Sequence, residues 1–287
     1  MHNIKKCNTI KECLNWGTEL LKSNNIDSPI INAEVLLCYA LELSRIEIRL
    51  RFNEIISLQH KQNFLECIKS RIENIPLQYI IGKITFYNIV LNVKKSVFIP
   101  RAETEELVKI ISTEINIHLG QVKNILDIGT GSGCIALSLA NEFPNLMVDG
   151  VDISEFAIDC ANYNRDNLNV KNVTFINIDF SKFCSNKKYD IIISNPPYIS
   201  LDDYNKLDKE LFFEPRIALT DEKDGLTFYR LIIKKLDGLL DKNGIVFLEC
   251  GINQAEQINY MFNNSEYQTK IIKDFAGIDR FIIAKKM

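Results

Sequence analysis

Short apolar runs alternate with helix-length segments through the second half of the 287-residue chain. The stretches that separate the runs, such as "GCIALSLANEF" and "EFAIDCANYNRDNL", have the spacing of amphipathic helices. This alternation predicts a parallel β-sheet with helices on both faces, because parallel strands need long crossover connections. Five runs follow the pattern: "NILDIG" (124–129), "MVDGVDI" (147–153), "VTFINID" (173–179), "YDIIISN" (189–195) and "GIVFLECG" (244–251).

Two further runs at the end of the chain are joined differently. "YQTKIIKD" and "DRFIIAKK" are separated only by a short turn around Gly277. A connection this short joins antiparallel strands, so we expect the two runs to close one edge of the sheet as a hairpin. The sequence therefore predicts an α/β, Rossmann-like domain with a mostly parallel seven-stranded sheet.

Residues 1 to about 75 have a helical pattern instead. In "DSPIINAEVLLCYALEL", Ser28 is the expected N-cap and Pro29 occupies the first helical position. The apolar residues expected on one face of this helix are Ile31, Val35, Leu36, Tyr39 and Ala40. In "SLQHKQNFLECIKSRIEN" they are Phe64, Leu65, Ile68 and Ile72. These segments predict a small helical bundle.

The stretch "FYNIVLNVKKSVFI" (86–99) differs from both regions. It is rich in β-branched and aromatic residues and is broken at "KKS", which favours a two-stranded connector. We therefore expect a helical bundle at 1–84, a β-hairpin connector at 85–99 and the α/β domain at 100–287.

Composition excludes several classes of protein. Apolar residues make up 46% of the chain and the formal net charge is −3, which argues against disorder and gives no support to stable nucleic-acid binding. The N-terminal stretch lacks the apolar core of a signal peptide, and no run approaches a membrane span, so we expect a cytoplasmic protein. The eight cysteines are scattered without a C-x-x-C pair, so we expect reduced thiols and no metal site.

Glycines follow the first apolar run in "LDIGTGSGCIAL". Gly129, Gly131 and Gly133, with Thr130 and Ser132 between them, lie between a predicted strand and a predicted helix. Glycines there allow a tight turn and a close approach of the backbone to a ligand, while the helix N-terminus offers free N–H groups. A turn that serves packing alone is the alternative.

Acidic residues follow the second and third runs. Asp152 can accept both hydroxyls of a ribose, as in NAD or S-adenosylmethionine sites, or can cap a helix starting near Ser154 or Glu155, and the two roles are compatible. Asp179 can accept from an adenine amino group, and Phe180 can pack on the ring or simply belong to the core.

The fourth run ends in Asn195-Pro196-Pro197-Tyr198. Pro197 biases Pro196 toward extended geometry, which leaves the Pro196 carbonyl free to accept a hydrogen bond beside the side-chain oxygen of Asn195. The two oxygens form a rigid pair of acceptors for a planar –NH2 group, and Tyr198 is expected to form an aromatic wall. The alternative is an ordinary turn that ends a strand.

All four features lie at the carboxyl ends of successive predicted strands, which is where open α/β sheets bind ligands. A planar nitrogen is a poor nucleophile because its lone pair is delocalised, and two acceptors can orient it toward an electrophile. A sulfonium methyl group is such an electrophile, and the nitrogen becomes acidic once methylated, so no dedicated base is required. The sequence therefore favours methylation of an amino or amide nitrogen.

These motifs resemble those of class I S-adenosylmethionine-dependent methyltransferases, and in particular the release factor glutamine methyltransferase family (PrmC/HemK). The resemblance extends over nearly the whole chain through "DSPIINAEVLL", "PLQYIIGKITFY", "VFIPRAETEELV", "LDIGTGSGCIAL", "SNPPYIS", "FEPRIALTDEKDGLTFYRLI", "LECGINQ" and "GIDRFIIAKK". It implies methylation of the glutamine in the Gly-Gly-Gln motif of class I peptide chain release factors, with the N-terminal bundle helping to hold that protein.

The resemblance also implies roles for individual residues. Residues 129–133 would line the methionine end of S-adenosylmethionine, Asp152 would hold the ribose and Phe180 would contact the adenine. The segment 195–198 would hold the glutamine, with Asn195 also near the cofactor. Three further residues match family segments without an assigned role and are left out of the predicted site: Arg101, Thr104 and Glu249.

Other functions are compatible with parts of this pattern. A ribosomal-protein glutamine or an exocyclic amino group of a nucleic-acid base is also a planar acceptor. An NAD-dependent oxidoreductase, or a nucleotide-binding module without catalysis, would use a similar glycine turn, although an oxidoreductase usually has G-x-G-x-x-G, and here the third glycine comes one residue earlier.

Overall fold

The computed structural model describes residues 4, 7–118, 120–263 and 266–286, and the chain divides into two compact units. The first unit ends at Gly82 and also includes Lys209–Phe213. The second unit contains Lys83–Asp208 and the chain from Glu214 onward. None of the helices in the described part of the chain is long and apolar enough to cross a membrane.

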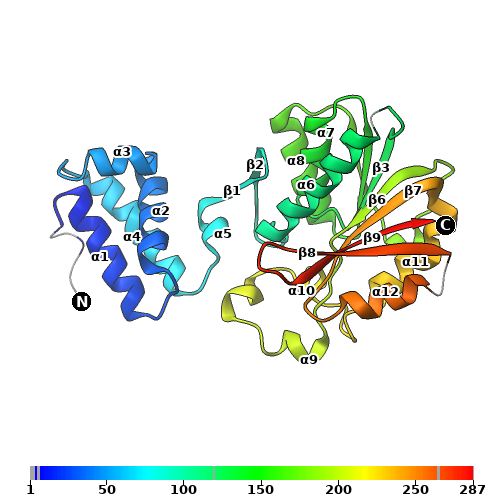
Figure 1. Cartoon of the computed structure of the whole chain (residues 1–287). Helices are drawn as coiled ribbons and strands as arrows, with labels where there is room; N and C mark the ends of the chain where they lie inside the picture. Colours follow the sequence, from blue (N-terminus) through cyan, green and yellow to red (C-terminus); the bar gives the residue numbers. More distant parts are fainter. Residues whose placement is uncertain (1–3, 5–6, 119, 264–265, 287) are drawn as a thin grey trace. The chain divides into compact units, whose positions relative to one another are not determined.

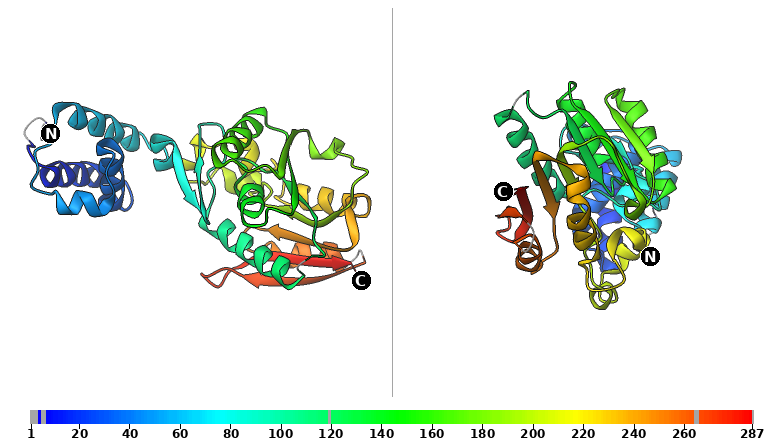
Figure 2. Two further views of the ribbon diagram at one scale, coloured as in Figure 1. Left: turned by 90° about the horizontal axis from the view of Figure 1, so that it is seen from above. Right: turned by 90° about the vertical axis from the view of Figure 1, so that its right-hand side faces the viewer.

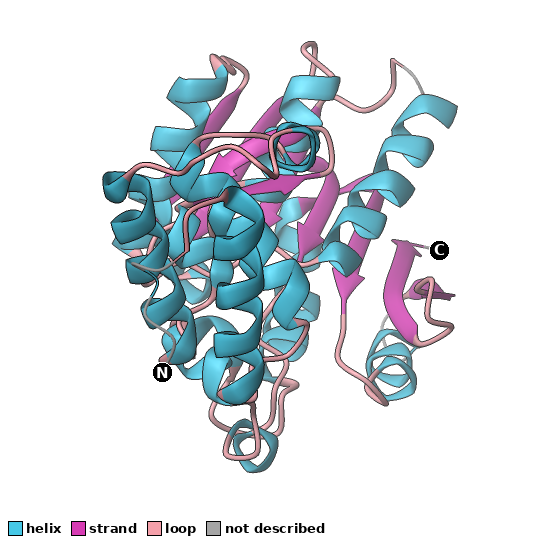
Figure 3. Ribbon diagram, turned by 90° about the vertical axis from the view of Figure 1, so that its left-hand side faces the viewer, coloured by secondary structure: helices cyan, strands magenta, loops and turns pink. Residues whose placement is uncertain are grey.

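The first unit is a bundle of helices, and Figure 3 draws these and the other helices of the chain in cyan. Phe64 and Ile68 are fully buried at its centre, and Trp16 contacts Phe64 edge-on. Two helices begin at capping boxes, in which Thr9 pairs with Glu12 and a second Ser/Glu pair repeats the arrangement. The helices are α1 (Ile10–Ser23), α2 (Pro29–Leu41), α3 (Arg45–Leu50), α4 (Leu58–Ile72) and α5 (Leu77–Ile81).

Helix α2 starts where the sequence predicts, but Ser28 does not cap it with its side chain. Ser28 precedes the helix, yet its backbone is left-handed (φ 48°) and its side chain makes no capping bond. The side chain of Asn32 instead donates to the carbonyls of Asp27 and Ser28. The predicted apolar face is also partly wrong, because Ile31 and Tyr39 are exposed.

In place of these residues, α2 buries two polar side chains, Asn32 and Glu34. Glu34 accepts hydrogen bonds from Arg45 and Arg49, and the bond from Arg45 is the main reason that the pKa of Glu34 is lowered. Asn32 accepts from Arg71 at 2.7 Å. Buried polar groups are tolerated when they are paired in this way, and apolar spacing alone does not reveal the pairing.

The second unit begins with an antiparallel hairpin of β1 (Lys83–Phe86) and β2 (Ile89–Asn92). The chain reverses at Tyr87, which is left-handed (φ 51°), and not at "KKS" as expected. The expected break forms a separate turn outside the hairpin, closed by a bond from the Val97 N–H to the Lys94 carbonyl.

The main sheet has the strand order β5-β4-β3-β6-β7-β9-β8. The first five strands in this order run parallel, and β9 is antiparallel to both β7 and β8. The predicted mostly parallel seven-stranded sheet with its C-terminal hairpin is therefore confirmed. The strands are β3 (Asn124–Ile128), β4 (Met147–Asp152), β5 (Val173–Asn177), β6 (Tyr189–Ser194), β7 (Leu240–Glu249), β8 (Tyr267–Lys273) and β9 (Asp279–Lys286).

Helices cover both faces of this sheet (Figures 1 and 2). Helices α6, α7 and α8 pack on one face, and α11 and α12 pack on the other. Two short helices, α9 and α10, follow β6. The helices are α6 (Ala102–Ile117), α7 (Cys134–Glu142), α8 (Glu155–Leu168), α9 (Leu201–Tyr204), α10 (Arg216–Leu219), α11 (Thr227–Leu239) and α12 (Ala255–Asn263).

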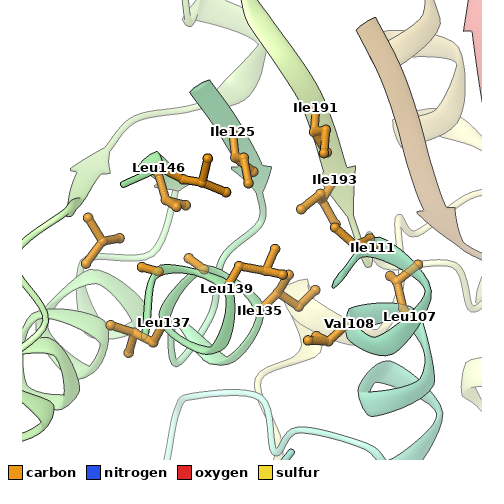
Figure 4. Close-up of a cluster of buried hydrophobic side chains, with 14 of the residues drawn as sticks. Leu107, Val108, Ile111, Ile125, Ile135, Leu137, Leu139, Leu146, Ile191 and Ile193 are labelled. Carbon is orange, nitrogen blue, oxygen red and sulfur yellow. The ribbon is translucent and has the colours of Figure 1, made fainter. Parts of the chain in front are cut away.

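Alternate residues of each strand enter different cores, as the pleat of a strand requires. In β6, Ile191 and Ile193 face α6 and α7, whereas Ile192 joins the core under α11 and α12. Figure 4 shows the first of these cores, with side chains from α6, α7, β3 and β6 directed toward one another. Both faces are apolar, so the sheet is buried in the centre of the unit.

Gly17 offers a test of packing in the first unit. It lies inside α1, where alanine normally gains about 1 kcal/mol over glycine. A Cβ at this position would approach the fully buried ring of Phe64 to 2.6 Å, and overpacking of this kind costs about 1–3 kcal/mol. We expect Gly17→Ala to lower the thermal unfolding temperature, measured by circular dichroism.

The control is Gly238 in α11, where a Cβ would have no neighbour within 4 Å. Gly238→Ala should raise the unfolding temperature, because only the helix preference acts there. A rise of the same size in Gly17→Ala would contradict the packing explanation.

Candidate functional site

A cavity of about 340 Å³ lies in the second unit, at the carboxyl ends of the parallel strands. The structure brings ten of the twelve predicted site residues to its wall: Gly129, Thr130, Gly131, Ser132, Asp152, Asp179, Phe180, Asn195, Pro196 and Pro197. The other two, Gly133 and Tyr198, lie outside the lining.

The glycine loop joins β3 to α7 with three left-handed glycines. Cβ atoms on Gly129 and Gly131 would meet nothing within 4 Å, so these residues leave open space beside the cavity. A Cβ on Gly133 would instead come within 2.9 Å of Leu137 and Phe175. The first two glycines therefore provide room for a ligand, and the third serves packing.

Asp127, which lies in β3 and was not among the predicted site residues, holds the glycine loop in place. Its Oδ2 accepts from the Thr130 hydroxyl at 2.7 Å, and its Oδ1 has no partner among the described residues. Burial raises the pKa of Asp127 to about 7. The carboxylate fixes the loop but does not line the cavity.

Asp152 ends β4 and joins two parts of the site. Its Oδ2 accepts from the Gly131 N–H and its Oδ1 accepts from the Ser154 N–H, both at 2.9 Å. Burial raises its pKa. The N-cap of α8 is Ser154, whose hydroxyl accepts from the Ala157 N–H. Asp152 lines the cavity, and Ser154, not Asp152, is the N-cap of α8.

Asp179 and Phe180 follow β5. The Asp179 carboxylate accepts from the Ser181 N–H, and the Ser181 side chain is the main cause of its lowered pKa. Phe180 is buried against Phe183, with ring centroids 6.2 Å apart, and the Lys235 ammonium lies 5.2 Å from its ring. Phe180 therefore belongs to the core and also lines the cavity, so that both predicted roles are compatible.

The chain leaves β6 at Asn195. Its Nδ2 donates to the hydroxyl of Thr104 at 3.1 Å, which leaves Oδ1 as the free acceptor. Among the described residues, no hydrogen bond reaches the Pro196 carbonyl. Asn195 and Pro196 thus supply two adjacent acceptor oxygens at the cavity wall.

Tyr198 is not brought to the cavity. Its ring packs against the core beneath α11 and α12, and its carbonyl accepts from the Gln254 side chain at 2.8 Å. Burial raises the pKa of its hydroxyl. The predicted aromatic wall is absent from the cavity lining that the described residues form.

Two segments that were not predicted complete the wall. They precede the sheet (Ser96–Phe98 and Pro100) and follow β6 (Pro215, Ile217 and Ala218). Glu214 connects them, because its buried carboxylate accepts from the Ile99 N–H at 2.9 Å and from Arg101. Arg101 also lies 4.6 Å from the centre of the Phe98 ring. The strand-end pattern could not reveal these residues, since they lie in loops.

Two family models match this chain. The family described as "PrmC N-terminal domain" matches residues 12–82, and the "Methyltransferase small domain" matches residues 103–223. The second match includes the glycine loop, Asp152 and the segment 195–198.

Curated relatives match nearly the whole chain. A release factor glutamine methyltransferase of Fusobacterium nucleatum is 37% identical over 282 residues, which cover 96% of this chain and 78% of that protein. One from Thermodesulfovibrio yellowstonii is 37% identical and covers 92% of this chain and 95% of its own length. Among solved structures, the chain is similar to a ribosomal protein L11 methylase from Lactobacillus delbrueckii (TM-score 0.46, 19% identity, 66% of this chain and 81% of that chain).

Glu214→Ala tests the connection between the two loop segments. The variant leaves the buried Ile99 N–H without its acceptor, so the free energy of unfolding should fall by about 1–3 kcal/mol in urea titrations. Glu222→Ala is the control, because it removes an exposed ion pair with Arg216 and should have little effect. Equal effects of the two variants would contradict this role for Glu214.

Proposed function

We propose that this chain, which belongs to the release factor glutamine methyltransferase family, transfers a methyl group from S-adenosylmethionine to a glutamine side-chain amide of a peptide chain release factor. The proposed target is the glutamine of the Gly-Gly-Gln motif in class I release factors. The observation that supports this chemistry most directly is the pair of acceptors, Asn195 Oδ1 and the Pro196 carbonyl, on the same cavity as the glycine loop.

The residues of the cavity fit S-adenosylmethionine, which supplies an electrophilic methyl group when bound. Gly129 and Gly131 have no side chains to occupy the space beside the cavity, and the Asp152 carboxylate is held in place for ribose hydroxyls. Asp179 can accept from an adenine amino group beside Phe180. The proposed cofactor residues are Gly129, Thr130, Gly131, Ser132, Asp152, Asp179, Phe180 and Asn195, while Gly133 supports the loop through its close packing.

Asn195 and Pro196 would hold the substrate amide. The lone pair of an amide nitrogen is delocalised, so its reaction depends on alignment with the methyl group. When the two oxygens accept both N–H groups, the face of the nitrogen is directed toward the cofactor. The nitrogen would form the new N–C bond as the C–S bond of the methyl group breaks, the sulfur would leave as a neutral thioether, and the amide proton would pass to water, so that no side chain is needed as a base.

The proposed reaction does not assign Tyr198 or Pro197 a contact with the amide. Pro197 lines the cavity and restricts the backbone of Pro196, which keeps the carbonyl in place. Tyr198 anchors the end of this segment through Gln254. Both would thus act by holding the acceptor pair.

We also propose that the first unit helps to bind the release factor. Its helices α2 and α3 expose large apolar side chains that the bundle core does not use, namely Ile30, Ile31, Tyr39, Ile46 and Leu50. Exposed apolar groups of this size are typical of protein contact surfaces. A release factor acts on ribosomes, so we place the reaction in the cytoplasm.

Transfer of a labelled methyl group tests the proposed function. The protein is incubated with S-adenosylmethionine and a release factor, and mass spectrometry should locate one added methyl group on the Gly-Gly-Gln glutamine. A release factor with that glutamine replaced by alanine should stay unlabelled. Label on duplex DNA or a ribosomal protein alone would overturn the proposed substrate.

Asn195→Ala tests the acceptor pair. Loss of alignment should lower kcat at least about 100-fold, because placement of a nucleophile contributes several kcal/mol to the rate. Binding of S-adenosylmethionine, measured by calorimetry, should weaken only moderately. Asn205→Ala is the control, since the side chain of Asn205 donates to the Leu201 carbonyl beside α9 and does not line the cavity. Full activity of Asn195→Ala would refute this mechanism.

A further inference from the structure

The side-chain amide of Asn195 has two orientations with opposite chemistry. With Oδ1 toward the cavity it accepts from a substrate –NH2 group, whereas with Nδ2 toward the cavity it would present a donor to another donor. The two forms have nearly the same shape, so packing alone does not distinguish them. A reaction that depends on this acceptor needs a polar group that fixes the orientation.

Two buried side chains form a chain of hydrogen bonds behind Asn195. Asn195 Nδ2 donates to Thr104 Oγ1 at 3.1 Å, and Thr104 Oγ1 donates to Glu249 Oε2 at 2.8 Å. Thr104 comes from α6 and Glu249 ends β7, and their exposed fractions are 2% and 1%. Three distant segments therefore meet at one point from which water is largely excluded.

The direction of these bonds follows from the number of protons. A carboxylate only accepts, so the single hydroxyl proton of Thr104 is given to Glu249. Thr104 Oγ1 is then left as an acceptor toward Asn195, and the group that can donate to it is Nδ2. We infer that Glu249, acting together with Thr104, is a positioning residue that holds Asn195 Oδ1 toward the substrate amide. This inference rests on the proposed function and deepens it.

The surroundings of Glu249 make its effect on the orientation of Asn195 sensitive to pH. Burial raises its pKa to about 7, while the bond from Thr104, the charge of Arg280 and a hydrogen bond with the Asn195 side chain act in the opposite direction. Arg280 is itself paired with Asp274. The titratable groups that act on Glu249 or feel its charge are Glu103 (α6), Cys134 (α7), Tyr198, Tyr229 (α11), Cys250 and Arg280 (β9).

Protonation of Glu249 removes the constraint on which group donates in the hydrogen bonds between Glu249, Thr104 and Asn195. A carboxylic acid can donate to Thr104, whose own proton is then free to point at Asn195. The amide can turn over, and the acceptor is lost from the cavity. Methyl transfer should therefore be complete above the pKa of Glu249 and should fall as the pH decreases through about 7.

Variants of Thr104 test the chain of hydrogen bonds that joins Asn195, Thr104 and Glu249. Thr104→Val keeps the shape but removes the hydroxyl, and it should lower kcat about 10- to 100-fold with little change in S-adenosylmethionine binding. Thr104→Ser restores the hydroxyl and should recover most of the rate. Ser112→Ala is the matched control, because Ser112 also donates from α6 to a carboxylate, Glu142, but lies outside the cavity lining. It should leave kcat unchanged.

Glu249→Gln tests the effect of pH. Glutamine fills the same space and does not titrate, so the fall in rate below neutral pH should become smaller, with the part due to Asp127 remaining, and the rate at pH 8 should be lower than in the native protein. A Glu249→Gln variant whose rate at pH 8 equals that of the native protein, or a Thr104→Val variant as active as the native protein, would overturn the inference.

A second readout does not depend on any substrate. The side-chain 15N–H2 signal of Asn195, assigned by its loss in Asn195→Ala, should titrate with a midpoint near the pKa of about 7 for Glu249. The titration should persist in Thr104→Ser and vanish in Glu249→Gln. A titrating signal without release-factor methylation would refute the proposed function alone. Methylation of the release factor with no titration of the Asn195 signal would refute only the role of Glu249 in orienting Asn195.

Discussion

Parallel pairing of β3 with its neighbours β4 and β6 is the constraint on which the site depends. Ile128 pairs with both Val151 and Ser194, so the residues that follow these strands leave the sheet at one edge. The glycine loop, Asp152 and Asn195 are therefore close in space although they are distant in sequence. The bond from the Gly131 N–H to Asp152 then joins two of the strand ends directly. The cavity is a consequence of strand register more than of any single loop.

Three carboxylates hold the groups around the cavity in place. Asp127, Asp152 and Glu249 all have raised pKa values because burial disfavours their charge. Each accepts hydrogen bonds from a group that the site requires: Asp127 from Thr130, Asp152 from Gly131, and Glu249 from Thr104. Burying such groups is unfavourable in itself, and their value lies in the fixed direction that they give to neighbouring donors.

Several expectations from the sequence failed for reasons that share a physical origin. Tyr87 adopts the left-handed backbone that reverses the hairpin, although glycine and asparagine are the usual residues there. Asn32 and Glu34 enter the bundle core because distant arginines satisfy them, which apolar periodicity does not detect. Tyr198 packs against the core under α11 and α12 and does not line the cavity. For Asn32, Glu34 and Tyr198, a tertiary contact overrode a local preference.

Local pattern by itself determined the seven strands, the glycine turn and the positions of Asp152 and Asn195, because the periods of strands and helices and the restrictions on glycine and proline act between near neighbours. Only the tertiary structure decided which way Asn195 faces and what supports the cavity wall. Thr104 and Glu249 are separated by 145 residues, and Ile99 and Glu214 by 115. Hydrogen bonds over such separations depend on how the helices pack on the finished sheet, and no spacing in the sequence encodes them.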